Sequence, residues 1–455
     1  MVSPFWHTFG IVINVKKRYI MNKTFILSAV IMLVTRAHAQ VSLDSCISYA
    51  VSHSTAVEMQ RVSARQAQAD YRYAKAALLP SVVANVSAQW SWGRGINPET
   101  NVYNNVTTFN NYYNLYASLT LFDGGRTINA LRQARLLKRS SSAAIAKARD
   151  AKAIEVMQCY VDAVYASQCI TLASRKLSES RDLLYKTRRM MELGTKSRPD
   201  VAQVEAQVAE DDYNLTHQRN EAQRTMLALK AAMNWPSDTV LTLDTTVCVS
   251  PQPQTDSAID IYRAFEYRSP EVATARTAVE SSRLSWLQQR GALLPTLSVE
   301  GGISTNYYQN LSQHGSVPSF ATQFSNNRGE YIGISLSIPI FVSSAWRATC
   351  RARSEWQTAA IELEDTRRRL HDNVCQAVMD RDAYAKEIVQ MERKVTSDSV
   401  AHHLNTRKYE EGMLSTFELH TSGQTLIESR IRLLQMRLLF VIKQRLVDYY
   451  KSGRI

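Results

Sequence analysis

The chain has 455 residues, of which 45% are hydrophobic, and it contains only 15 Gly and 11 Pro. Such a composition excludes a polytopic α-helical membrane protein, and the scarcity of Gly and Pro favours long helices. The formal charge of +13 raises the question of nucleic-acid binding. However, the basic residues are interleaved with Asp and Glu and form no basic stripe with aromatic side chains. We therefore expect no nucleic-acid partner.

Residues 1–39 have the features of an N-terminal extension followed by an export signal. A basic residue precedes an apolar run at 25–34, which is too short to span a bilayer as a helix. Ala37-His38-Ala39 then supplies a cleavage motif of the A-x-A type ahead of Gln40. We expect translation to begin at Met21 and cleavage to fall near Ala39/Gln40. A buried N-terminal helix, the alternative, would not require this order of features.

The cysteines predict neither a disulfide framework nor a metal site. Their spacing contains no C-x-x-C and no pairing with His, and they are too sparse to staple a small fold. The six positions are Cys46, Cys159, Cys169, Cys248, Cys350 and Cys375. Cys159 and Cys169 lie in an Ala-rich helical pattern, where we expect them to behave as small apolar side chains.

Three landmarks occur twice, in the same order, at an offset of roughly 215–219 residues. They are Ala-Leu-Leu-Pro at 77–80 and 292–295, Phe122 and Phe341, and Gly194 and Gly412. A nearly constant offset indicates a tandem duplication. We place the first repeat at 40–236, a connector with some strand character at 237–257, the second repeat at 258–450 and a short tail at 451–455.

Each repeat begins with a helical segment, predicted at 44–79 and 258–294. Leu-Leu-Pro ends each segment, because Pro disfavours helix in the residue before it. Pro80 and Pro295 therefore mark junctions where a helix gives way to a strand. Two strands follow in each repeat, separated by polar, Asn-rich loops at about 92–111 and 308–327.

Helical pattern resumes after the strands and continues for most of each repeat. Very long helices are predicted at 124–191 and 343–410, and a Gly separates each from a second helix at 197–233 or 415–450. At 1.5 Å per residue the long helices would reach roughly 100 Å. A soluble coiled coil would account for such helices but would leave the strands unexplained.

The four strands, at about 81–91, 112–122, 296–307 and 329–341, alternate apolar and polar residues over a length that suits a tilted membrane strand. A half-buried sheet in a soluble protein is the alternative. Aromatic residues gather at the strand ends, as in an interfacial girdle, and with the export signal they favour an outer-membrane barrel. Four strands cannot close a barrel, so the chain must oligomerise. Two copies would give a filled interior, and three copies leave room for an aqueous lumen.

This layout resembles the TolC family of outer-membrane efflux channels across nearly the whole mature chain. The resemblance rests on the duplication, on Leu-Leu-Pro before each strand pair, on Phe-Asp-Gly-Gly-Arg at 122–126 and on two Gly-x-x-Ser-x-x-acid turns. It implies an α+β membrane protein in which a long α-helical periplasmic barrel continues a β-barrel with four strands per protomer and twelve in the trimer. The connector would then lie in an equatorial region.

The resemblance also implies partners and a location. A homotrimer in outer-membrane lipid would extend into the periplasm and dock to a periplasmic membrane-fusion adaptor and to an inner-membrane RND-type pump or ABC exporter. Drugs or other small molecules would leave through a tripartite pump; a type I protein secretion duct and a periplasmic coiled-coil scaffold are the alternatives. A passive porin needs more strands in one chain and far less helix.

The two Gly-x-x-Ser-x-x-acid turns predict helix caps, in which Gly ends one helix, Ser caps the next and the acid completes a capping box. The resemblance makes these turns the periplasmic hairpin tips. It implies adaptor contacts at Gly194, Ser197, Asp200, Gly412 and Ser415, and a gate or constriction at Glu418 and Tyr409. Leu414 and Thr421 depart from the family pattern, which has an Arg and a second acid there, so an ion-pair lock is not expected.

No enzyme signature is present. A P-loop, G-x-S-x-G and H-E-x-x-H are all absent. His402 and His403 are adjacent and point in different directions on a helix, so they make a poor metal pair. We therefore expect neither catalysis nor a cofactor, and energy for transport would come from the inner-membrane partner.

Overall fold

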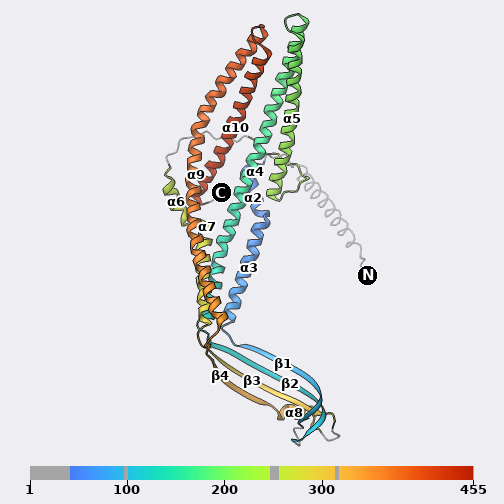
Figure 1. Cartoon of the computed structure of the whole chain (residues 1–455), viewed down its shortest axis with the longest axis vertical. Coiled ribbons are helices and arrows are strands. Elements are labelled where there is room, and N and C mark those ends of the chain that lie inside the picture. Colours follow the sequence, from blue (N-terminus) through green and yellow to red (C-terminus); the bar gives the residue numbers. More distant parts are fainter. Residues whose placement is uncertain (1–40, 97–100, 246–255, 313–316, 454–455) are drawn as a thin grey trace, which may run out of the picture. The chain divides into compact units, whose positions relative to one another are not determined.

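The computed structural model of the protein describes residues 41–96, 101–245, 256–312 and 317–453 (Figure 1). The predicted signal peptide, Cys248 and half of the predicted connector lie outside these residues. The chain divides into two compact units, which we describe separately. The hairpin unit comprises Met1–Ser54, Lys152–Gln254 and Asp380–Arg445, and the strand unit comprises Thr55–Ala151, Thr255–Met379 and Leu446–Ile455.

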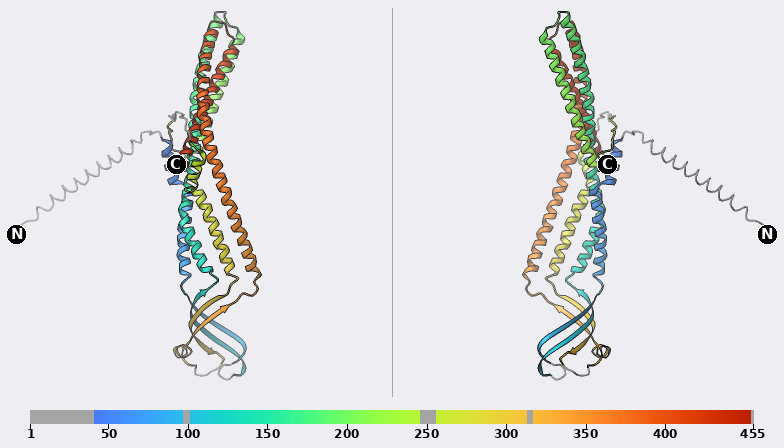
Figure 2. Two further views of the ribbon diagram at one scale, coloured as in Figure 1. Left: turned by 90° about the vertical axis from the view of Figure 1, so that its left-hand side faces the viewer. Right: turned by 90° about the vertical axis from the view of Figure 1, so that its right-hand side faces the viewer.

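The strand unit contains one antiparallel sheet in the order β1-β2-β3-β4. Its strands are β1 (Ser81–Ile96), β2 (Tyr103–Phe122), β3 (Thr296–Asn310) and β4 (Gly329–Ser337). Each repeat supplies one hairpin, and the two hairpins join where β2 pairs with β3. Figure 2 shows the strands bent and twisted along their length. The sheet is therefore a composite of both halves of the duplication.

The register places the four apolar alternations on one face of the sheet, as the sequence predicts. Leu115 on β2 pairs with Ala84 on β1 and with Ile303 on β3. Val299 on β3 pairs in turn with Ile334 on β4. Because paired residues project to the same side, we call this side the apolar face and the other, rich in Ser, Asn and Tyr, the polar face.

The first strand pair is longer than predicted and includes most of the segment expected as a loop at 92–111. Trp92 pairs with Thr107, and Trp90 pairs with Phe109 with their rings 4.6 Å apart. Aromatic cross-strand pairs and continuous ladder hydrogen bonds outweigh the low strand propensity of the Asn residues. β4, in contrast, ends at Ser337, since Pro339 cannot donate to a ladder.

A short helix, α8 (Phe320–Asn326), occupies part of the second predicted loop. It covers the edge of β3 beyond Ser304, where pairing with β4 stops. The Gln323 amide accepts from the backbone N of Tyr308 at 2.9 Å and donates to its O at 3.0 Å. Asn327 donates to the O of Asn306 at 2.9 Å. These side chains satisfy backbone groups that a neighbouring strand would otherwise bind.

The first helical segment of each repeat is divided in two. The four helices are α2 (Leu43–His53), α3 (Thr55–Ala76), α6 (Ala258–Glu266) and α7 (Pro270–Gly291). Ser54 has extended backbone angles that interrupt the first segment. Pro270 interrupts the second, because it excludes helix at Ser269, which caps α7 instead. Pro80 and Pro295 each immediately precede a strand, β1 and β3.

Four helices account for most of the helical residues: α4 (Arg126–Glu192), α5 (Arg198–Met233), α9 (Ser343–Glu410) and α10 (Thr416–Ser452). Their ends lie within about two residues of the predicted ones. α4 begins just after Gly124, whose φ is +69°. A Cβ on Gly124 would lie 2.3 Å from the backbone O of Gly291, so the end of α7 and the start of α4 meet through two glycines. Among the described helices, none has the length and apolar character needed to cross a membrane.

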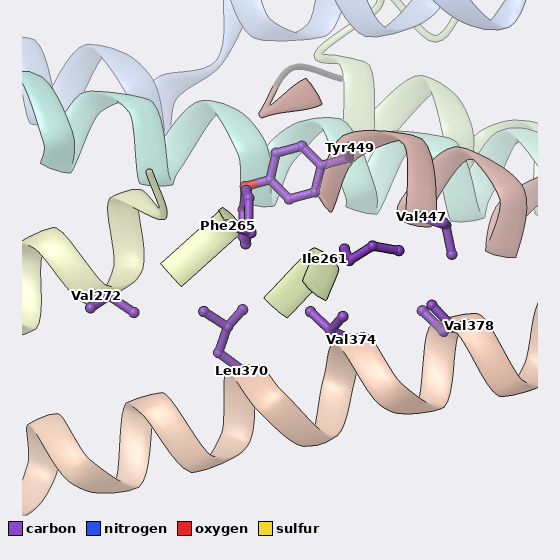
Figure 3. Close-up of a cluster of buried hydrophobic side chains, with 9 residues drawn as sticks. Ile261, Phe265, Val272, Leu370, Val374, Val378, Val447 and Tyr449 are labelled. Carbon is purple, nitrogen blue, oxygen red and sulfur yellow. The ribbon is translucent and has the colours of Figure 1, made fainter. Parts of the chain in front are cut away.

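The core of the strand unit gathers residues from α6, α7, α9 and the end of α10 (Figure 3). Phe265 and Tyr449 meet edge to face with centroids 5.0 Å apart, and the Tyr449 hydroxyl donates to Asp150 at 2.8 Å. Burial, together with that hydrogen bond, raises the pKa of Tyr449. The aliphatic members are Ile261, Val272, Leu370, Val374, Ala377, Val378 and Val447.

In the hairpin unit the connector is held against α4. The Tyr160 hydroxyl donates to the backbone O of Asp244 at 2.9 Å, and Val41 forms a parallel bridge with Leu243. Of the cysteines in the described residues, Cys46 and Cys169 are buried, and burial raises the pKa of Cys46 to about 11. Both therefore act as small apolar side chains, in keeping with the prediction for Cys169.

Candidate functional site at the hairpin tips

The two tips, between α4 and α5 and between α9 and α10, begin with the same helix ending. Gly194 has φ +79° and Gly412 has φ +74°, angles that favour glycine. Nothing lies within 4 Å of a Cβ added at either position, so conformation alone demands glycine. Thr195 N donates to Met190 O at 2.9 Å, and Met413 N donates to Lys408 O at 2.8 Å, which closes the last turn of each helix.

A capping box starts each following helix. In the first tip, Ser197 donates from its backbone N to Asp200 Oδ2 at 2.9 Å, and its hydroxyl accepts from Asp200 N at 3.4 Å. In the second, Ser415 N donates to Glu418 Oε2 at 3.1 Å, and its hydroxyl accepts from Glu418 N at 3.2 Å. Both predicted acids therefore satisfy backbone groups at helix starts.

The first tip contacts the second through side-chain interactions that the sequence analysis did not predict. Asp200 also accepts from the Thr416 hydroxyl, with 3.0 Å between Oγ1 and Oδ1. Lys196 donates to the backbone O of Leu414 at 3.3 Å. Its ammonium also lies 4.2 Å from the centre of the Tyr409 ring, within cation–π range. These contacts join residues of the two repeats.

Tyr409 is fully buried between the hairpins. Its hydroxyl forms a hydrogen bond of 2.9 Å with Thr187 Oγ1, on α4. One residue along each helix, Lys186 and Glu410 form an ion pair at 2.5 Å. Tyr409 therefore anchors α9 to α4 within one protomer, just before the second tip.

The predicted gate residue Glu418 has a different setting. It is fully exposed, and the hydrogen bonds from Ser415 lower the pKa of its carboxyl group. The pKa of Asp200 is also lowered, chiefly by hydrogen bonds from Ser197, with Thr416 and Lys196 adding to the effect. Both groups are carboxylates at neutral pH, but only Asp200 links the two hairpins.

The two positions that depart from the family pattern take part in different hydrogen bonds. Leu414 accepts the hydrogen bond from Lys196 through its backbone O, so this contact does not require a particular side chain at position 414. Thr421 donates to the backbone O of Phe417, one turn earlier in its own helix, at 3.0 Å.

Large apolar side chains are exposed at both tips, and the sequence analysis did not single them out. Leu193 is 80% exposed, Met413 66% and Phe417 64%. Each lies next to a predicted cap residue, so the signal was present as apolar residues inside the turns. Exposed apolar side chains grouped at a hairpin end are typical of a protein-contact surface.

A groove of about 560 Å³ lies between the hairpins in this unit, beside Phe417. Its walls include Gln207, His402 and His420. Burial, followed by the charges of Lys176 and Arg430, lowers the pKa of His402 and favours its neutral form. Over the described part of the chain, no group of three His, Cys, Asp or Glu side chains is placed to hold a metal ion.

The sequence matches the model of the outer membrane efflux protein family in two segments, 46–234 and 261–445. These segments correspond to the two repeats and together span most of the chain. The chain therefore belongs to the outer membrane efflux protein family. A comparison with curated protein sequences finds no match.

Solved channel structures share the fold. The outer membrane protein VceC from Vibrio cholerae superposes with a TM-score of 0.76 at 15% identity, over 90% of this chain and 96% of that one. The Campylobacter jejuni CmeC outer membrane channel superposes with a TM-score of 0.76 at 14% identity, over 90% of this chain and 85% of that one. The Neisseria gonorrhoeae MtrE outer membrane channel superposes with a TM-score of 0.69 at 18% identity, over 90% of this chain and 88% of that one. The protein is thus a TolC-like channel protein by fold.

Proposed function

We propose that the protein is the outer-membrane channel-tunnel of a tripartite efflux pump, acting as a homotrimer that exports drugs or other small molecules. The observation that carries this proposal is the sheet. Its apolar face includes widely exposed branched side chains, such as Ile332 at 83% and Ile334 at 74% exposed. Such a surface suits lipid, and the polar face behind it suits a water-filled lumen.

The open edges of the sheet support the trimer. In the described residues β1 and β4 each pair on one side only. Unpaired backbone groups at an edge are not tolerated in the hydrocarbon region, so further strands must complete the barrel. Three copies supply twelve strands, which leave an aqueous lumen.

The hairpin tips support docking of a periplasmic adaptor. The apolar side chains of Leu193, Met413 and Phe417 would form the contact, next to the groove between the hairpins. The caps built on Gly194, Ser197, Asp200, Gly412 and Ser415 hold these side chains on defined turns. Glu418, exposed and ionised, would repeat three times around a cation-favouring constriction. Tyr409 would keep α9 fixed to α4 behind it.

The protein itself need not hydrolyse anything, since an inner-membrane RND-type pump or ABC exporter would supply the energy. A type I protein secretion system would need the same kind of outer-membrane channel. The choice between them therefore depends on which exporter the adaptor binds.

The proposal is tested with the mature full-length protein expressed in a Gram-negative host. We expect it in the outer-membrane fraction as a trimer that, once purified in detergent, conducts in planar bilayers. Recovery in the soluble periplasmic fraction would instead identify a coiled-coil scaffold. For the constriction, Glu418→Ala should change single-channel conductance or its block by multivalent cations, while Glu411→Ala, in the turn after α9, serves as the matched control.

A further inference from the structure

Glu300 is the single charged side chain on the polar face among the strand residues that the structure describes. The polar face otherwise carries Ser, Thr, Asn, Gln, Gly, Val and Tyr. Arg94 and Glu330, the other charged residues of the strands, lie on the apolar face by the same register. Because no other charged side chain on this face offsets it, the Glu300 carboxylate dominates the local electrostatic potential of the polar face.

The neighbours of Glu300 leave its carboxylate accessible. It pairs with Ser118 on β2 and with Gly333 on β4, which have a small side chain and none. A Cβ on Gly333 would lie 3.8 Å from Glu300 Cγ and 3.9 Å from Oε1, so the side chain extends across this glycine. Glu300 is exposed and has no ion pair within the described ranges.

An aromatic ring occupies the adjacent row of the same face. Gly302, two residues along β3, pairs with Tyr331 on β4 and with Tyr116 on β2. A Cβ on Gly302 would lie 3.0 Å from Tyr331 Cε1, so the tyrosine ring lies across that glycine. Rows two residues apart are separated by roughly 7 Å. The carboxylate and the ring therefore flank one another, each extending over a glycine of the opposite strand.

A carboxylate beside an aromatic ring is suited to an organic cation. The carboxylate supplies the charge, and the ring attracts a weakly hydrated ammonium through its quadrupole and its apolar surface. We propose that Glu300 and Tyr331 form a binding site for organic monocations, such as quaternary ammonium compounds, on the polar face of the sheet.

This inference rests on the proposed function, in which the polar face lines the lumen. The site would then occur three times at one height in the barrel, far along the chain from Glu418 and independent of it. It would let the duct retain amphipathic cations during export and would make the barrel prefer cations over anions.

The test uses the wild-type trimer and three variants in planar bilayers at low salt. Glu300→Gln should lower the K⁺/Cl⁻ permeability ratio roughly twofold, with a smaller effect at high salt because of screening. The same variant should weaken current block by benzyltriethylammonium severalfold. Tyr331→Leu should weaken the block but leave the permeability ratio unchanged, because it removes the ring and keeps the charge.

Glu330→Gln is the matched control. It removes the same charge from the same hairpin, but Glu330 lies on the apolar face and is ion-paired with Arg328. Its permeability ratio and block should equal those of wild type. Wild-type block retained in Glu300→Gln, or a change of equal size in Glu330→Gln, would overturn the inference while leaving the channel intact. Absence of any conducting trimer from wild-type protein would overturn the proposed function itself, and this inference with it.

Discussion

The tip between α4 and α5 and the tip between α9 and α10 start from the same local sequence pattern and end with different connections. Each uses a glycine at positive φ, a serine cap and an acid that completes the capping box. Asp200 in the first tip also binds Thr416 of the second, whereas the hydrogen bonds of Glu418 to other described residues stay within its own turn. Both tips therefore have the same caps, but the two acids have different settings: Asp200 joins the hairpins, and Glu418 is exposed.

The largest expected effect comes from breaking the anchor that both tips share. Tyr409→Ala should destabilise the packing of α9 on α4 by about 3 kcal/mol, because a fully buried aromatic ring and its hydrogen bond to Thr187 are lost. Hydrogen exchange of the amides in 183–196 should accelerate accordingly. Tyr213→Ala, which removes a ring that is 68% exposed on α5, should leave hydrogen exchange of the amides in 183–196 unchanged. Equal effects of the two variants would contradict the anchoring role of Tyr409.

The comparison itself is tested by removing each acid in turn. Asp200→Ala should cost about 1–2 kcal/mol of tip stability, since it removes a cap and the link to Thr416. Glu418→Ala should have a smaller effect, limited to its own turn. The measurement is local exchange at both tips in each variant. The double variant Asp200→Ala/Thr416→Val should show non-additivity; simple addition would mean that the observed hydrogen bond does not couple the hairpins.

Substitution of the two tip glycines, Gly194 and Gly412, should lower stability by similar amounts, because their backbone angles and surroundings are similar. Gly194→Ala and Gly412→Ala should each cost about 1 kcal/mol from the left-handed backbone conformation alone. Thermal denaturation of the purified protein gives the two values under identical conditions. A much larger cost at one glycine would show that a side chain there is excluded by a neighbour, which the open space around both positions argues against.

The smallest effect is a pH dependence of stability, which we test at the first tip. The pKa of Asp200 is lowered in the folded protein, so its carboxylate contributes stability above the pKa of the unfolded chain. This contribution is lost as the pH falls below about 4 and through the folded pKa. The melting-temperature difference between wild type and Asp200→Asn should therefore shrink between pH 5 and pH 3. A difference that grew on acidification would have the wrong sign for a carboxylate stabilised by hydrogen bonds.

Helices and caps could be predicted because their signals are local. The segment 343–410 was predicted as one helix, and α9 runs from Ser343 to Glu410. Ser415 and Glu418 are three residues apart, so their capping box follows from spacing alone. The hydrogen bond between Thr416 and Asp200 joins residues 216 positions apart. No local pattern encodes such a contact, and only the folded hairpins bring the two side chains together.

Strand lengths were the weaker part of the prediction for the same reason. Asn-rich residues such as Asn110 and Asn111 read as a loop when taken alone, yet they pair with Gln89 and Ala88 because a whole strand lies beside them. α8 was missed because its seven residues are too few for a periodic signal, and its role depends on the free edge of β3.

The unequal lengths of the outer strands have a consequence for assembly. β1 spans 16 residues and β4 only 9, with α8 covering the edge of β3 beyond β4. A seam between two copies of the proposed trimer would therefore be closed by no more than the length of β4, which also limits the β3–β4 ladder inside each copy, whereas the β1–β2 and β2–β3 ladders are longer. Of these two short ladders, only β3–β4 joins strands of one covalent chain, so the barrel would come apart along its seams first and release intact protomers. Assembly would follow the reverse order: the hairpins would form first, then the four-stranded sheet of each protomer, and then the closed barrel.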